Sequence, residues 1–318
     1  EKSFFVHINY RTKFKIQNSE FRIIEKYFKK GGLRLWKIGI IRIHYLSIYF
    51  AKTKNLEKKI LFLDLDGTLL NDKKEITEEN LAAIGKAIDA GHAVVVTTGR
   101  PRGGITAQIK ALKLDRPGCF AIAANGATIY NTYTGAMIYE NGVPREYLRY
   151  AFDEAYKYGV HPQTYSHEDV LTEHDNAEVR YYCNMVKMSY EVVPDVSEAI
   201  DYDPIKMLFI HLDHRSKLEA FRAHIEPWYQ ERKLEVFFSC DRHLECLPEG
   251  VSKGSGVRFM RELLGVHYET TLAAGDAEND ISMLQYAGVG VAMANAQPAV
   301  KAAADYVTYS NDEYNDLR

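Results

Sequence analysis

The chain has 318 residues, of which 46% are hydrophobic and 26% are charged, and its formal net charge is −3 at pH 7. This is the composition of an ordinary globular protein long enough for two domains, and the overall charge argues against a nucleic-acid-binding protein. The four cysteines form no Cys-x-x-Cys pair, which argues against a disulfide or zinc framework and predicts reduced thiols in the core: Cys119, Cys183, Cys240 and Cys246.

Residues 1–57 differ from the rest of the chain. Residues 1–59 carry 15 Lys and Arg side chains against four Glu, whereas the remaining 259 residues carry 25 basic and 39 acidic side chains. Charged residues interrupt the apolar run 33–50, so neither a transmembrane helix nor a signal peptide fits well. Three interpretations of this basic extension stay open: an amphipathic helix on a membrane surface, a poorly ordered appendage, or sequence upstream of the true start.

The first predicted element of the fold is a buried strand that begins near Lys59 and leads into Asp64-Leu65-Asp66-Gly67-Thr68. Residues at i and i+2 of a strand point to the same side, so we expect the Asp64 and Asp66 side chains to converge. Two adjacent carboxylates are costly unless a cation or a shared proton relieves their repulsion. Oxygen ligands next to a phosphate favour Mg²⁺ as that cation.

Alternating helices and strands follow. A helix begins at the N-cap Thr77 and ends at Gly91, and the β-branched run 93–97 predicts a second buried strand followed by Thr98-Gly99-Arg100-Pro101. A helix over 102–114 and a strand over 119–123, which ends at Asn125-Gly126, complete the pattern. The order predicts an α/β fold with a doubly wound parallel sheet.

The pattern changes after this sheet. Residues 128–139 predict a hairpin, and residues 144–248 mix strands and helices without strict alternation, which indicates an inserted α+β domain. Within the insert we expect a helix, a loop with short strands, a second helix, a strand over 207–212, a third helix, and strands over 234–238 and 244–247. Five of its polar side chains could reach a substrate but are more simply surface residues: His161, Tyr165, His167, His174 and Arg242.

The first pattern returns at Ser252-Lys253-Gly254. A helix over 254–264, a strand over 270–274 and the segment 275–280 come next, followed by a helix over 281–286, a strand over 289–293, a helix from Pro298 and a short strand at 306–308. We therefore expect one core domain made of residues 58–143 and 249–318, with the inserted cap, residues 144–248, between its two parts.

Four polar clusters are now expected at one edge of the core sheet. The chain resembles the haloacid dehalogenase superfamily and, within it, the Cof-type phosphatases, over about residues 58–313. The resemblance depends on four motifs in the family's order: Asp64-Leu65-Asp66-Gly67-Thr68, Thr98-Gly99-Arg100-Pro101, Ser252-Lys253-Gly254 and Gly275-Asp276-Ala277-Glu278-Asn279-Asp280. The family's closing helix is expected to be missing after Glu313, and the basic extension also departs from the family pattern.

The resemblance implies the catalytic roles. Asp64 is the nucleophile that forms an aspartyl-phosphate, Asp66 is the general acid and then the base, and Thr98 and Lys253 are also catalytic. The phosphate is bound by Leu65, Thr98, Gly99, Lys253 and Asn279. Mg²⁺ is held by Asp64, Asp66 (through its main-chain carbonyl) and Asp276, while Asp280 fixes Lys253 or metal-bound water. Arg100 is expected to form a structural ion pair.

The sequence thus predicts a cytoplasmic, Mg²⁺-dependent phosphatase that hydrolyses small phosphorylated metabolites such as sugar phosphates, or flavin and other cofactor phosphates. Nucleic acid and membrane are not expected as partners. One alternative is a phosphotransferase or mutase that uses the same aspartyl-phosphate. Two others are not enzymes: a protein that only binds phosphorylated metabolites, which would not need both Asp64 and Asp66, and a membrane-associated binder that uses the basic extension.

Overall fold

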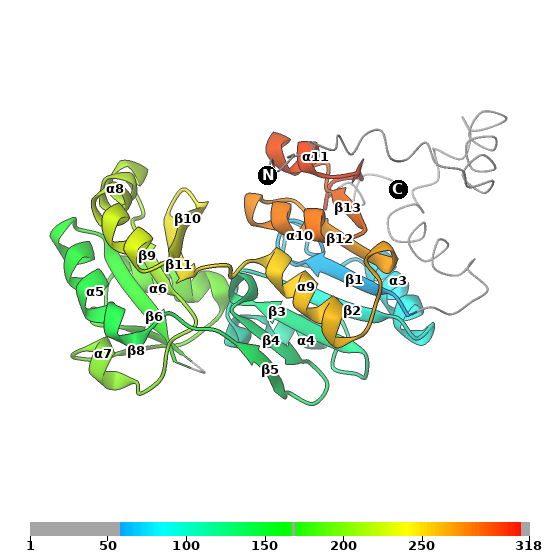
Figure 1. Ribbon diagram of the computed structural model, residues 1–318, viewed down its shortest axis with the longest axis horizontal. Helices are drawn as coiled ribbons and strands as arrows, with labels where there is room; N and C mark the ends of the chain where they lie inside the picture. Colours follow the sequence, from blue (N-terminus) through cyan, green and yellow to red (C-terminus); the bar gives the residue numbers. More distant parts are fainter. Residues whose placement is uncertain (1–57, 167–168, 313–318) are drawn as a thin grey trace, which may run out of the picture. The chain divides into compact units, whose positions relative to one another are not determined.

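A computed structural model of the chain describes residues 58–166 and 169–312 (Figure 1). The basic extension, residues 1–57, lies outside the described residues, as do His167 and the segment 313–318 where the family's closing helix was expected to be missing. Within the described part of the chain, no helix combines the length and the apolar character needed to cross a membrane.

The core contains an eight-stranded sheet in the order β14-β13-β12-β1-β2-β3-β4-β5. Its strands are β1 (Ile60–Asp64), β2 (Ala93–Thr97), β3 (Cys119–Ala123), β4 (Thr128–Asn131), β5 (Met137–Glu140), β12 (Thr271–Gly275), β13 (Val289–Ala292) and β14 (Tyr306–Val307). The six strands from β14 to β3 are parallel, and β4 and β5 form the predicted hairpin at one edge. All five residues of β1, β2, β3 and β12 are buried, as expected for strands covered on both faces.

Helices cover both faces of this sheet. Alternate residues of β1 take part in two different hydrophobic clusters: Leu61 and Leu63 pack with residues of α3 (Glu78–Asp89) and α4 (Thr106–Ala111). Ile60 and Phe62 pack with residues of α9 (Lys253–Leu263), α10 (Ile281–Tyr286) and α11 (Pro298–Ala303). The core is therefore the doubly wound α/β sheet that the sequence predicts.

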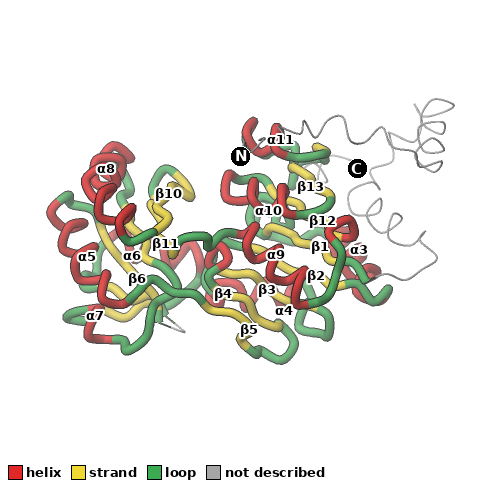
Figure 2. Tube along the Cα trace, in the orientation of Figure 1, coloured by secondary structure: helices red, strands yellow, loops and turns green. Residues whose placement is uncertain are grey.

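The insert forms a second, six-stranded sheet in the order β10-β11-β9-β6-β7-β8, shown as yellow segments in Figure 2. Its strands are β6 (His161–Tyr165), β7 (Val170–Thr172), β8 (Tyr190–Val192), β9 (Met207–Ile210), β10 (Leu234–Cys240) and β11 (His243–Pro248). Its helices are α5 (Leu148–Lys157), α6 (Ala177–Val186), α7 (Val196–Ala199) and α8 (Arg215–Glu231). Helices α5 and α8 pack on one face of the sheet and α6 packs on the other, so the cap has hydrophobic clusters of its own.

Two local predictions need correction. The helix expected over 102–114 is a 3₁₀ turn (Arg102–Ile105) followed by the short α4, because Gly103 and Gly104 are poor helix formers. The cysteines expected in the core are free and mostly buried, but Cys240, near the end of β10, is exposed.

Candidate active site

The site begins at the point where the order of the core sheet reverses. From β1 the chain adds β2 and β3 on one side, and it later returns to place β12 on the other side, in register with β1 at Leu63 and Ala274. Asp64 is the last residue of β1, and Asp276 directly follows the last residue of β12. Ligands of open α/β sheets bind at such a switch point, beyond the carboxyl ends of the strands.

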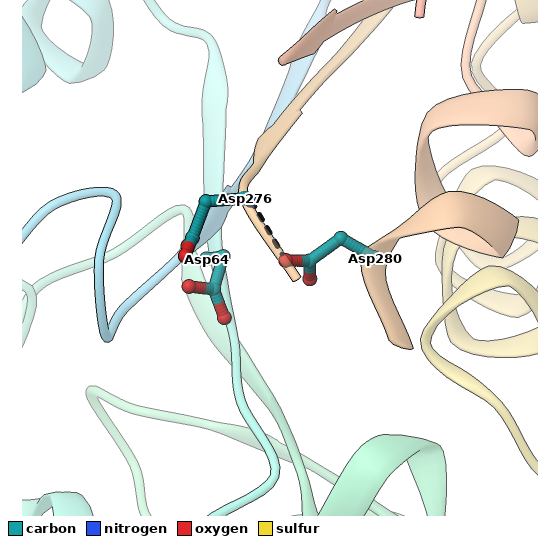
Figure 3. Close-up of side chains that lie close together, drawn as sticks. All are labelled: Asp64, Asp276 and Asp280. Carbon is teal, nitrogen blue, oxygen red and sulfur yellow. Dashed lines mark hydrogen bonds between the residues drawn. The ribbon is translucent and has the colours of Figure 1, made fainter. Parts of the chain in front are cut away.

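Three carboxylates gather there. Asp64, Asp276 and Asp280 each have a carboxylate oxygen within 4.8 Å of the others (Figure 3). Asp280 is completely buried, and its Oδ2 accepts hydrogen bonds from the backbone N–H groups of Asp276, at 3.0 Å, and Ala277, at 2.9 Å. Asp280 therefore anchors the turn that carries Asp276.

The ammonium group of Lys253 joins this cluster. Its Nζ lies 2.6 Å from Oδ1 of Asp64 and 2.6 Å from Oδ1 of Asp280, and its side chain is 2% exposed. Lys253 is the first residue of α9, whose start is fixed by reciprocal side-chain and backbone hydrogen bonds between Ser252 and Ser255. The hydrogen bonds at the start of α9 thus hold the buried ammonium group of Lys253 against Asp64, the predicted nucleophile.

Burial and the neighbouring carboxylates both shift the pKa values of these groups. Burial and then Asp280 raise the pKa of Asp64 well above its usual range, although Lys253 works in the opposite direction. Burial and Asp280 also raise the pKa of Asp276, to about 6. Burial opposes the charge on Lys253, but Asp280 and Asp64 outweigh it and raise the pKa of the ammonium group. One lysine therefore does not neutralise the three carboxylates, and the site can accept further positive charge.

The loop after β1 is shaped around Asp276. The Thr68 hydroxyl donates a hydrogen bond to Oδ1 of Asp276 at 2.9 Å. Gly67 has φ +84°, and a Cβ atom at this position would collide with the Asp276 carboxylate. The glycine is thus needed both for its backbone conformation and for its missing side chain.

Asp66 does not converge with Asp64 in this structure. Both of its carboxylate oxygens are bound by Arg100, at 2.6 and 2.7 Å, and Lys74 Nζ lies 3.0 Å from Oδ1. The expectation from strand alternation is wrong because β1 ends at Asp64, and Asp66 already belongs to the following turn. Its side chain is absent from the carboxylate cluster found among the described residues. Arg100 does form an ion pair, as expected, but its partner is the predicted general acid.

The predicted phosphate-binding residues lie on neighbouring segments. Thr98 follows β2 and is buried, and its hydroxyl accepts a hydrogen bond from the backbone N–H of Arg100 at 3.1 Å. Leu65 follows Asp64 and is also buried. Gly99 and Asn279 both approach Asn125: a Cβ on Gly99 would lie 3.1 Å from Oδ1 of Asn125, and Nδ2 of Asn279 donates to that oxygen at 2.9 Å.

The sequence did not reveal how Asn125, Glu245 and Lys206 are connected. Nδ2 of Asn125 donates a hydrogen bond to Oε2 of Glu245 at 3.1 Å, and Nζ of Lys206 lies 2.8 Å from the same oxygen. The only sign of this connection in the sequence is that Glu245 lies inside the apolar strand β11 and Lys206 directly precedes the apolar strand β9. Two cap residues expected at the surface, His161 and Tyr165, are buried instead, whereas His174 and Arg242 are exposed.

The acidic cluster suits a hard divalent cation. Its donors are carboxylate oxygens, which Mg²⁺ prefers, and burial together with the neighbouring carboxylates raises the pKa values of Asp64 and Asp276, so that a cation would favour their charged forms. Asp280 is less available as a ligand, because Lys253 and two backbone N–H groups already occupy its oxygens.

Comparisons with known proteins agree with this geometry. The statistical model of the haloacid dehalogenase-like hydrolases matches residues 61–316. Pyridoxal phosphate phosphatase YbhA of Escherichia coli is 30% identical over 261 residues, which are 80% of this chain and 94% of that protein. Phosphatase YwpJ of Bacillus subtilis is 30% identical over 294 residues, with 80% and 96% covered.

A solved structure is similar to this chain in both fold and sequence. The crystal structure of a haloacid dehalogenase-like hydrolase from Bacteroides thetaiotaomicron superimposes with a TM-score of 0.75 at 33% identity, and the match covers 82% of this chain and 97% of that one. On the family match and these relatives, the chain belongs to the haloacid dehalogenase-like hydrolases and is a phosphoric monoester hydrolase of that family.

Proposed function

We propose that the protein hydrolyses phosphate monoesters of small metabolites through an aspartyl-phosphate on Asp64, with Mg²⁺ as its cofactor. The observation that carries this proposal is the position of Lys253, whose ammonium group bridges Asp64 and Asp280 at 2.6 Å each. A buried cation against a buried carboxylate at the end of a parallel strand is the arrangement needed to draw a phosphoryl group onto that carboxylate.

In the first half of the reaction, a carboxylate oxygen of Asp64 attacks phosphorus while the bond from phosphorus to the ester oxygen breaks. Asp66 gives its proton to the departing oxygen, so that an alcohol leaves. In the second half, ionised Asp66 takes a proton from water, and the water oxygen attacks phosphorus. The bond from phosphorus to Asp64 breaks, which releases inorganic phosphate and restores both aspartates.

Lys253, Thr98, Gly99 and Asn279 bind the phosphoryl oxygens in this proposal. Negative charge spreads over three equatorial oxygens during transfer, so fixed donors around them lower the barrier. Asp64 and Asp276, with the main chain of Asp66, would hold Mg²⁺, which when bound offsets the repulsion between Asp64 and the phosphoryl group. Asp280 keeps Lys253 and the backbone of Asp276 in place.

The substrate class rests on chemistry and relatives together. The YbhA relative is named for pyridoxal phosphate, a small phosphate ester of a primary alcohol. For this chain we propose sugar phosphates and similar small phosphorylated metabolites, with the cap covering the leaving group. A phosphotransferase or mutase would share the aspartyl-phosphate, and it would differ by passing the phosphoryl group to an added acceptor sugar instead of water.

The test is a screen for released inorganic phosphate with a panel of sugar phosphates, pyridoxal 5′-phosphate and flavin mononucleotide, with Mg²⁺ and with excess chelator. We expect Mg²⁺-dependent release from members of this panel, and Asp64→Asn should reduce the rate below about one thousandth of wild type. Asp89→Asn, at a carboxylate that is 74% exposed, is the matched control and should not change the rate. A substantial residual rate in Asp64→Asn would exclude Asp64 as the nucleophile.

A further inference from the structure

A continuous series of hydrogen bonds joins two charged residues of the cap to a predicted phosphate ligand of the core. Lys206 Nζ donates to Oε2 of Glu245 at 2.8 Å, and Asn125 Nδ2 donates to the same oxygen at 3.1 Å. Asn279 Nδ2 then donates to Oδ1 of Asn125 at 2.9 Å. Lys206 Nζ also donates to the carbonyl oxygen of Gly99 at 2.9 Å. We call Lys206, Glu245, Asn125 and Asn279 the amide relay.

The charged end of the amide relay is deeply buried. The side chains of Lys206 and Glu245 are 1% and 6% exposed, and the Lys206 ammonium group lies 5.4 Å from the centre of the Tyr165 ring. Burial opposes the charge on Lys206, but Glu245 outweighs it and the pKa of Lys206 is raised, so the ammonium group keeps its charge. Buried ion pairs are often no more stabilising than apolar residues of the same volume, so stability alone does not account for this one.

The backbone at Asn125 is also arranged for the contact. Ala124 and Asn125 have φ values of 48° and 57°, a left-handed conformation that residues other than glycine seldom adopt. Backbone hydrogen bonds fix this turn against the loop after β2: Asn125 N–H donates to the Thr98 carbonyl at 3.0 Å, and Ala124 N–H donates to the Arg100 carbonyl at 2.9 Å. The side chain of Asn125 thereby lies against Gly99.

The chemistry of the charged pair determines how each amide is oriented. The Glu245 carboxylate can only accept, so Asn125 must present its NH₂ group to Glu245 and its oxygen to Asn279. Asn279 must then present its NH₂ group to Asn125. One N–H of Asn279 remains for a ligand, and its Oδ1 is buried without a hydrogen-bond partner among the described residues. If the acceptor at Glu245 were missing, the side-chain amides of Asn125 and Asn279 could both flip and exchange the positions of NH₂ and oxygen.

We propose that Glu245 and Lys206 are positioning residues: they hold the Asn279 amide in the one orientation in which its NH₂ group donates to the phosphoryl group, and they fix the carbonyl of Gly99 beside it. The cap thus contributes to phosphate binding in the core without touching the phosphate. This inference rests on the part of the proposed function that makes Asn279 and Gly99 the groups that bind phosphate.

Two double variants separate positioning from stability. Lys206→Met/Glu245→Leu removes the ion pair and the acceptor, whereas Lys206→Met/Glu245→Gln removes the charges but keeps an amide oxygen that can accept from Asn125. We expect the first variant to lower kcat/KM by about 10- to 100-fold and to weaken inhibition by inorganic phosphate, the size seen when partners that orient a site's ligands are lost. The glutamine variant should recover most of the kcat/KM and most of the inhibition by inorganic phosphate. The melting temperatures of the two variants should agree within a few degrees.

A control tests for a general effect of losing an ion pair from the cap. Arg215→Met/Glu219→Leu removes an exposed ion pair of α8, in which Nε of Arg215 lies 2.9 Å from Oε1 of Glu219. This variant should leave kcat, KM and inhibition by inorganic phosphate unchanged. If the leucine double variant does not fold, Asn125→Gly carries the test, because glycine tolerates the left-handed backbone and only the amide is lost. Asn125→Gly should show the same decrease in kcat/KM, about 10- to 100-fold, which is the size expected when an orienting partner is lost.

The positioning role is overturned if the leucine double variant, or Asn125→Gly in its place, keeps the wild-type kcat/KM and phosphate inhibition. It is also overturned if the glutamine variant is as impaired as the leucine variant, because the effect would then depend on charge and not on the acceptor. Calorimetric titration with inorganic phosphate separates this result from failure of the proposed function. A wild type that binds phosphate but hydrolyses no ester contradicts the phosphatase proposal, while weaker phosphate binding in the leucine variant still supports the relay.

Discussion

Arg100 binds Asp66 through both carboxylate oxygens, with Nε 2.7 Å from Oδ2 and Nη2 2.6 Å from Oδ1. Burial acts to raise the pKa of Asp66, but Arg100 and Lys74 outweigh it and the pKa is lowered. The ionised form suits the second half of the proposed reaction, in which Asp66 accepts a proton from water. The first half needs protonated Asp66, so the contact with Arg100 has to open, or its hold on the carboxylate has to weaken, when substrate is bound.

The first prediction concerns this contact. Arg100→Gln keeps a hydrogen-bond donor near Asp66 but removes the positive charge, so the pKa of Asp66 should rise by about one unit or more. More of Asp66 is then protonated at neutral pH, and the alkaline limb of the pH profile of kcat/KM for an alkyl phosphate should move to higher pH. Arg116→Gln, at a more exposed ion pair with Asp89, is the control. An unchanged alkaline limb in Arg100→Gln would mean that Arg100 does not control the acid.

The second prediction separates the two tasks of Asp66. When p-nitrophenyl phosphate is the substrate, p-nitrophenolate leaves without being protonated, whereas the alkoxide that leaves an alkyl phosphate needs a proton from the acid. Asp66→Asn should therefore release about one equivalent of p-nitrophenol per active site in a burst and then stop, because the aspartyl-phosphate lacks a base for its hydrolysis. With an alkyl phosphate the same variant should form phosphoenzyme at least about 100-fold more slowly than wild type. Rapid mixing with detection of p-nitrophenol and of acid-stable phosphoprotein measures both, and steady turnover of both esters would refute the assignment.

Much of this site follows from patterns that are local in the sequence. Short apolar runs that end in polar residues identified the buried parallel strands, and the carboxyl ends of parallel strands meet at one edge of the sheet. For that reason Asp64, Asp276 and Lys253 could be expected together although they come from distant parts of the chain. The structure brings their side chains into one cluster.

The parts that could not be predicted depend on where a strand stops and on which distant residues meet. Strand alternation placed Asp66 beside Asp64, but β1 ends at Asp64, two residues before Asp66. Glu245 and Asn125 are 120 positions apart, one in strand β11 of the cap and the other in the turn after β3 of the core, so no periodicity connects them. A charged residue inside an apolar strand signals that a partner exists without saying which residue it is.

The third prediction links Mg²⁺ to pH. The pKa of Asp276 is raised from 3.8 to about 6, so between these values the folded protein binds a proton that the unfolded chain has released. Without metal, this group therefore lowers stability as the pH rises through that window. Near pH 5, Mg²⁺ should stabilise the protein little, because it has to displace the proton from Asp276. Near pH 8 it should add about 1.4 to 2.7 kcal/mol when present at 10 to 100 times its Kd.

Thermal melting with and without Mg²⁺ at the two pH values measures this difference. Asp276→Asn removes one carboxylate from the crowded cluster, so it should melt at or above the wild-type temperature without metal and lose the response to Mg²⁺. Asp89→Asn should keep that response. Equal stabilisation of wild type and Asp276→Asn by Mg²⁺ would show that Asp276 does not hold the ion.

The fourth prediction concerns two buried histidines of the cap. Burial lowers the pKa of His161 and of His243 to about 4 each, and Nε2 of each ring is buried without a hydrogen-bond partner among the described residues. An unfolded histidine takes up a proton near pH 6.5, whereas these two stay neutral in the folded protein. Each therefore contributes stability that is present above about pH 6.5 and is lost as the pH falls toward 4, by up to about 1.4 kcal/mol per pH unit.

Urea unfolding between about pH 7 and pH 5 tests this linkage, because other groups also titrate in acid and only the difference between variants isolates one histidine. His243→Leu removes one buried titrating group while keeping an apolar side chain against Tyr182, so its free energy of unfolding should fall less steeply with decreasing pH than that of wild type. His214→Gln removes an exposed histidine and serves as the control. A slope in His243→Leu as steep as in wild type would mean that His243 already carries its proton in the folded cap, which its burial and its ring contacts with Tyr181 and Tyr182 make costly.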